Sequence, residues 1–160
     1  MQEIQTRPRD TTPIKTKLRS YGNLQRRIEH QITRLENLMD TIDSLPATNY
    51  SGMPSGPHDG TSKAERYVEK KDELERKIRK MVKEEKQLKE ELEELIALLS
   101  DPDEQAILLI KYIDCFEWED VSFALYGAQP DYADNEERYM KRTFRLHGAA
   151  LQRLAAVFPA

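Results

Sequence analysis

The sequence predicts an all-α protein in which a long antiparallel coiled-coil hairpin (14–100) is followed by a C-terminal helix-turn-helix domain (101–160). Two stretches repeat apolar residues every three or four positions, over about 30 and about 40 residues, as coiled coils do. A segment rich in proline and glycine separates them. The composition, 38% apolar and 34% charged, is lean for one round core and favours an elongated helical protein.

Residues 1–13 carry two prolines and almost no apolar pattern, so we expect them to be disordered or loosely attached, with a helix beginning after Pro13. From there a heptad seam follows, interrupted only by the polar Gln31. The seam consists of Tyr21, Leu24, Ile28, Leu35, Leu38, Ile42 and Leu45.

The loop at 46–62 contains three prolines and three glycines, which do not sustain a helix. Loops of this length are usually functional or mobile, so it is either a docking segment or a connector without a function of its own. Thr61 or Ser62 can cap the next helix, and Glu65 completes a capping box with Ser62.

The second long helix continues the heptad pattern, with Lys71 and Glu85 at two seam positions. Its apolar seam is Tyr67, Leu74, Ile78, Met81, Leu88, Leu92, Leu95 and Leu99. A two-helix hairpin buries only one stripe, so we expect a homo-oligomer, most simply a dimer, held by residues of the two seams.

Three helices are expected in the C-terminal domain. Pro102 suits the first turn of a support helix that extends to Ile113. A short second helix runs from Trp118 to Leu125 and ends at Gly127 in a left-handed conformation. The third, roughly 135–157, is capped by Asp134 or Asn135.

The third helix separates into two faces. Its inner face is expected to be Met140, Phe144, Leu151, Leu154 and Phe158, and Trp118 is expected at the helix junction with Ile110, Val121, Leu125 and Phe144. The other side carries Arg138, Lys141, Arg142 and Arg145, where a recognition helix places side chains against DNA. The alternative is a solvated charged face.

The charges are unevenly distributed, although the net charge is only −4. Residues 101–133 hold eight acidic side chains and one lysine, whereas 138–153 hold only basic ones, Arg153 included. Such a local basic face suits specific contacts to double-stranded DNA, while its nonspecific electrostatic attraction to DNA is modest. An adaptor or structural protein, whose basic face binds acidic protein, remains the alternative.

The sequence resembles two known groups of proteins. The run LLIKYIDCFEWEDVSFAL, with a cationic helix ending HGAALQRL, resembles the C-terminal DNA-binding region of sigma factors. Over about residues 18–157 the chain is similar to phage-encoded regulators of late or lytic genes, most distinctively at Tyr50–Asp59 with its Gly52-Met53-Pro54. The resemblance implies a transcription regulator that binds promoter DNA or works beside RNA polymerase.

Signatures of other functions are missing from the sequence. The single cysteine, Cys115, and three scattered histidines predict neither a disulfide nor a metal site. No phosphate-binding loop appears, and the Glu90-Glu91 and Glu93-Glu94 pairs lie on a solvated helix, so we expect no enzyme and no cofactor. Without an apolar leader or membrane span, we expect a protein of the bacterial host's cytoplasm.

Overall fold

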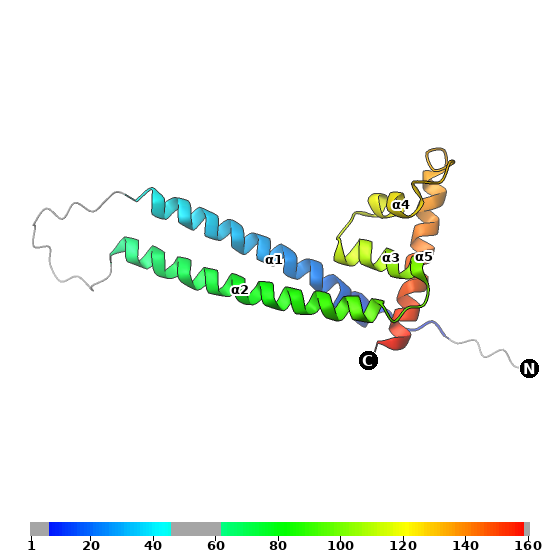
Figure 1. Ribbon diagram of the computed structural model, residues 1–160, viewed down its shortest axis with the longest axis horizontal. Coiled ribbons are helices and arrows are strands. Elements are labelled where there is room, and N and C mark those ends of the chain that lie inside the picture. Colours follow the sequence, from blue (N-terminus) through cyan, green and yellow to red (C-terminus); the bar gives the residue numbers. More distant parts are fainter. Residues whose placement is uncertain (1–6, 46–61, 159–160) are drawn as a thin grey trace, which may run out of the picture. The chain divides into compact units, whose positions relative to one another are not determined.

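The computed structural model describes residues 7–45 and 62–158, whose regular elements are all helices. The long helices α1 (Thr12–Asp43) and α2 (Lys63–Ile96) pack against each other as a hairpin (Figure 1). The shorter helices that follow are α3 (Pro102–Leu108), the π-helical turn η1 (Leu109–Ile113), α4 (Trp118–Tyr126) and α5 (Glu136–Val157). The predicted all-α fold class is confirmed. The loop motif at Tyr50–Asp59 lies outside the described residues.

Both long helices begin with side-chain caps. The Asp10 carboxylate accepts a hydrogen bond of 2.9 Å from the Thr12 backbone N–H, so α1 begins at Thr12 and holds Pro13 in its first turn. At α2 the Ser62 hydroxyl accepts from the Glu65 N–H at 3.1 Å, and the Glu65 carboxylate accepts from the Ser62 N–H at 3.2 Å. This reciprocal pair is the predicted capping box.

Within the stretch expected to be loosely attached, the backbone of Arg9 contacts α5. The Arg9 N–H donates to Gln152 Oε1 at 2.9 Å, and Gln152 Nε2 donates to the Arg9 carbonyl at 2.9 Å. One amide side chain of α5 therefore satisfies both backbone groups of Arg9, and α1 follows directly. Residues 1–6 lie outside the described residues.

The predicted heptad seams are confirmed by burial. Every seam position described in the two helices is buried or half-buried, including the polar Gln31, Lys71 and Glu85. Glu85 is half-buried because its carboxylate accepts a 2.6 Å hydrogen bond from the hydroxyl of the buried Tyr21. The α2 helix ends at Ile96, three residues before the last seam residue, Leu99, which is nevertheless buried.

The chain divides into two compact units, which we call the composite unit (1–23 and 85–160) and the hairpin unit (24–84). The sequence-based division at residue 101 groups the chain differently, because both long helices contribute side chains to the composite core. That core joins Ile14, Leu18 and Tyr21 of α1 and Leu92 and Ile96 of α2 to Ile107, Leu108, Val121, Leu151 and Leu154.

The short helices of the composite unit begin and end for local reasons. Asp101 caps α3 by accepting from the Asp103 N–H at 2.9 Å, and η1 continues the helix to Ile113 as predicted. The prediction of a left-handed conformation at Gly127 is wrong, because its φ is −61°. A Cβ there would lie 2.5 Å from the Phe123 carbonyl oxygen, so space rather than backbone conformation requires glycine.

Candidate nucleic-acid interface

The face that α5 buries differs from the predicted one. Leu151 and Leu154 are buried as expected and Phe158 is half-buried against the core, but Met140 is only half-buried and Phe144 is 47% exposed. The other buried residues are Tyr139, Thr143 and Ala150. Relative to the prediction the helix is turned by about 50 degrees, taking 100 degrees per residue.

Hydroxyl groups with local partners explain this rotation. The Thr143 hydroxyl donates to the Tyr139 carbonyl at 2.8 Å, and the Tyr139 hydroxyl donates to Asp131 Oδ1 at 2.5 Å. Because both hydroxyls are satisfied, the two side chains bury without the cost of an unpaired polar group. The hydrogen bond to Asp131 raises the pKa of the Tyr139 phenol, assisted by desolvation.

The same tyrosine orders the acidic turn at 127–135. The Tyr139 ring lies 5.4 Å from that of Tyr126 and 5.5 Å from that of Tyr132, measured between centroids. Asn135 occupies the N-cap position of α5, but its side chain makes no cap and instead donates to the Asp131 carbonyl at 3.0 Å. The predicted side-chain cap from Asp134 or Asn135 is therefore wrong, and Asn135 braces the turn.

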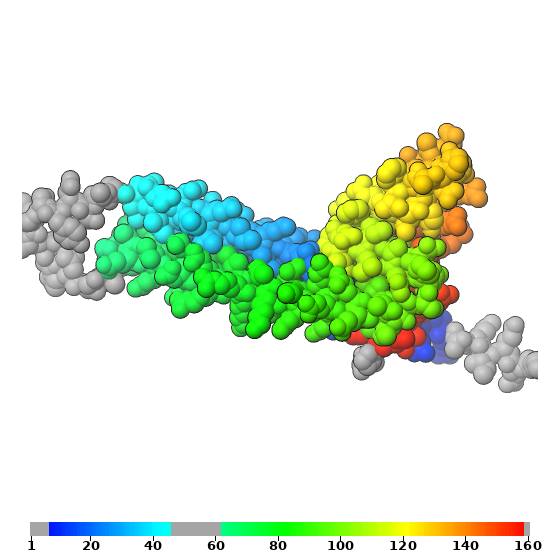
Figure 2. Space-filling view, in the orientation of Figure 1, coloured from blue at the N-terminus to red at the C-terminus, as the bar shows by residue number. Residues whose placement is uncertain are grey.

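The four predicted contact residues all lie exposed on the outer side of α5. Arg138, Lys141 and Arg145 line one shallow depression, whereas Arg142 lies with its guanidinium carbon 5.0 Å from the centre of the Tyr126 ring. Figure 2 shows α4 and the first half of α5, in yellow and orange, at the surface of the composite unit. The structure thus brings three of the cations together and places the fourth on an aromatic ring.

Carboxylates share this surface, which the sequence reasoning missed. Asp134, Glu136 and Glu137 line the same depression, and Glu137 lies 3.7 Å from Lys141 Nζ in an exposed ion pair. Glu136 and Glu137, in the first turn, interact favourably with the positive end of the helix dipole, but their charge repels a phosphate group. The spacing of Glu137 and Lys141 by four residues was the available signal.

Arg153, counted with the basic run in the sequence, is an exposed residue that pairs with two acidic side chains near the start of α3. Its guanidinium donates to the buried Glu104 and lies 3.9 Å from the Asp101 carboxylate. The four predicted contact residues, at 138–145, therefore lie in the first half of the helix, apart from the ion-paired Arg153.

The other side of α5 has a structural role. Trp118 packs edge-on against Phe144 at 5.0 Å and against His147 at 4.7 Å, so its predicted place at the helix junction is confirmed, although it stays partly exposed. The Tyr112 hydroxyl lies 2.7 Å from His147 Nε2. Burial, together with Lys15, Lys111 and Arg19, lowers the pKa of His147 to about 4, so the ring is neutral at neutral pH.

Two kinds of feature are absent from the described ranges, 7–45 and 62–158. There, His, Cys, Asp and Glu side chains form no group of three or more that could hold a metal ion. None of the helices there is long and apolar enough to cross a membrane.

One family model matches the chain, that of a protein family of unknown function, DUF1492. The match covers residues 62–139, just under half of the chain, and the chain is similar to this family there. It includes α2 to α4 and Arg138, and it ends before Lys141. No curated protein and no solved structure gave a match.

Proposed function

We propose that the protein binds double-stranded DNA through α5 and regulates transcription of late or lytic genes of a phage or prophage, in the cytoplasm of the bacterial host. The observation that carries the proposal is the division of α5, whose inner face packs in the core while Arg138, Lys141, Arg142 and Arg145 project outward from its first half. Recognition helices of helix-turn-helix proteins present their contacts in this way.

The arrangement of the short helices supports the same reading. The α5 helix packs against both α3 and α4, and α4 is joined to α5 by the braced turn at 127–135. The likeness of residues 108–125 to sigma factors favours this helix-turn-helix, and it motivates a second proposed partner, RNA polymerase. No enzymatic step and no cofactor is part of the proposal.

The charges predict a binding strength. Four phosphate contacts per copy give a slope of log affinity against log salt of about −3.6, at roughly 0.9 per neutralised phosphate. The carboxylates of Asp134, Glu136 and Glu137 oppose DNA approach, so we expect a weaker interaction than a purely basic helix would give. Arg142 is already ordered against Tyr126 in the free protein, so less side-chain entropy is lost when it binds DNA.

A protein adaptor is the second candidate, and exposed aromatic side chains favour it. Phe123 is 62% exposed and Phe144 is 47% exposed, both on helices that build the proposed surface. Aromatic and arginine side chains together are typical of protein interfaces. In this alternative the basic face binds an acidic protein.

The test is binding of the full chain to labelled promoter fragments from the genome that encodes it, by fluorescence anisotropy at about 50 and about 200 mM salt. Alanine replaces Arg138, Lys141, Arg142 and Arg145 together. The matched control replaces Arg76, Lys80, Lys83 and Lys86, four exposed cations of α2.

We expect the α5 variant to lose at least about tenfold in affinity and to flatten the salt slope by about 3 units, while the control changes affinity by less than about threefold. Circular dichroism checks that both variants keep their helices. A folded α5 variant that binds promoter DNA as tightly as the parent refutes the DNA-binding proposal and favours the adaptor.

A further inference from the structure

The hairpin unit has two distinct flanks beside its seam. In the heptad, position e follows a seam residue at d, and position g precedes a seam residue at a. Because α1 and α2 run in opposite directions, the e positions of both helices share one flank and the g positions share the other. Arg34 and Thr41 of α1 and Lys70 and Lys77 of α2, all at g, indeed line a common groove.

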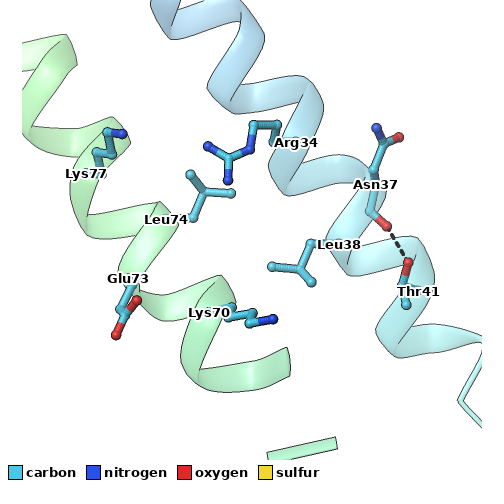
Figure 3. A pocket seen from close by; sticks show the side chains of 8 residues that line it. All are labelled: Arg34, Asn37, Leu38, Thr41, Lys70, Glu73, Leu74 and Lys77. Atoms are coloured by element: carbon cyan, nitrogen blue, oxygen red, sulfur yellow. Dashed lines mark hydrogen bonds between the residues drawn. The ribbon is translucent and has the colours of Figure 1, made fainter. Parts of the chain in front are cut away.

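The g flank is basic. Leu38 and Leu74 face each other across the groove, and Arg34 and Lys70 extend into the gap between the helices (Figure 3). Glu73 is the single acidic residue that lines the groove. A second copy placed on this flank in a symmetric dimer would bring like charges together, which is unfavourable.

The e flank carries the exposed apolar side chains of the hairpin unit, with Gln25 and Glu75 as its polar members. Within the described part of the hairpin unit, four large apolar side chains are exposed: Ile32 at 39%, Met39 at 42%, Val68 at 43% and Val82 at 44%. Each directly follows a seam residue at position d, so all four lie on the flank opposite the basic groove. Exposed apolar residues that are scattered need no explanation, but a single stripe indicates an interface.

We infer that a second copy of this chain covers the apolar e flank, so that two hairpins pack flank to flank as a four-helix bundle. The heptad seams predicted to hold a dimer are already packed between α1 and α2, which leaves the e flank as the apolar surface for association. Self-association on the basic g flank is disfavoured by its charge. A symmetric dimer therefore uses Ile32, Met39, Val68 and Val82.

The available area matches what a dimer needs. About 20 residues of each helix in the hairpin unit extend about 30 Å, and two neighbouring helices are about 20 Å wide. Their flank offers about 600 Å² per copy, or about 1,200 Å² in total, at the lower end of stable interfaces. We therefore expect a dimer that forms in the micromolar range.

This inference deepens the proposed function, because a dimer would present two α5 helices to one DNA site. Dimerisation is measured without DNA, so the dimer inference and the DNA-binding proposal can each fail while the other holds. Sedimentation equilibrium of the full chain, from about 1 to about 100 μM, gives the dimer dissociation constant. The apolar variant carries Ile32→Gln and Val82→Gln, and the matched control carries Arg34→Gln and Lys77→Gln on the g flank.

Glutamine is a better helix former than isoleucine or valine, so both variants should keep their helices, which circular dichroism checks. We expect the apolar variant to weaken dimerisation at least about tenfold and the control to change it less than about threefold. If the apolar variant unfolds, Met39→Gln alone is measured and should weaken the dimer about threefold. The inference is overturned by a parent chain that is monomeric at about 100 μM, by an unchanged apolar variant, or by an equally weakened control.

Discussion

Protonation of His147 should destabilise the composite unit at acidic pH. The imidazole is packed beside Trp118 and lies 2.7 Å from the Tyr112 hydroxyl, which donates to Nε2 when the ring is neutral with its proton on Nδ1. A proton on Nε2 removes that acceptor. Lys15 and Arg19 of α1 and Lys111 of η1 add positive charge nearby, so the imidazolium is opposed by burial and by three cations.

The size of the effect follows from the change in pKa. The pKa of His147 falls from 6.5 to about 4 on folding, so the unfolded chain binds more protons between these values. The stabilisation is therefore fully present above pH 6.5 and is lost as the pH falls towards 4. At about 1.4 kcal/mol per pKa unit the upper limit is about 3 kcal/mol, and because water reaches part of the ring we expect about 2 kcal/mol.

The assay compares urea unfolding of the parent and His147→Gln between about pH 4 and pH 8, because glutamine does not titrate and can still accept from Tyr112. The unfolding free energy of the parent should fall by about 2 kcal/mol relative to that of His147→Gln as the pH falls through this window. His30→Gln, at an exposed position of α1, is measured alongside as the control. A constant difference, or an NMR pKa of His147 close to 6.5, would refute the reasoning.

Two further predictions concern packing. Gly127→Ala should destabilise the protein by about 1–3 kcal/mol because the new Cβ meets the Phe123 carbonyl. Gly148→Ala should stabilise it by up to about 1 kcal/mol, because a Cβ there meets nothing within 4 Å beyond its own helix backbone and chain neighbours. Equal effects of the two substitutions in urea unfolding would contradict this. Trp118→Ala should cost about 2–3 kcal/mol, less than a fully buried tryptophan, and unchanged thermal stability would show that the ring contributes nothing to the core.

The long helices could be predicted because their burial follows a simple period. The seam residues recur every three or four positions, and this spacing alone placed Leu24 and Leu92 on buried faces, where both lie. The capping box at Ser62 and Glu65 is likewise local, since its two hydrogen bonds join residues three positions apart. Local spacing was sufficient for these two features.

Contacts between distant segments could not be read from the pattern. Arg153 appeared to belong to a basic run, but its partner Glu104 lies 49 residues earlier and is buried in α3. Arg9 appeared to be in a loose tail, but its partner Gln152 is 143 residues away. In both cases one side chain satisfies groups on another segment, and that pairing depends on how the helices meet.

The four cations of α5 are exposed as predicted, although the face of α5 that was predicted to be buried is wrong. Apolarity ranked Phe144 above Tyr139, yet Tyr139 is buried because Asp131, in the preceding turn, accepts a hydrogen bond from its hydroxyl. The resulting shift of the inner face is about 50 degrees, whereas the four cations lie about 150 degrees from either version of that face, at 100 degrees per residue. A set of charged residues centred opposite the core therefore stays exposed for any modest rotation. Residues at the edge of the stripe, such as Phe144, change environment first.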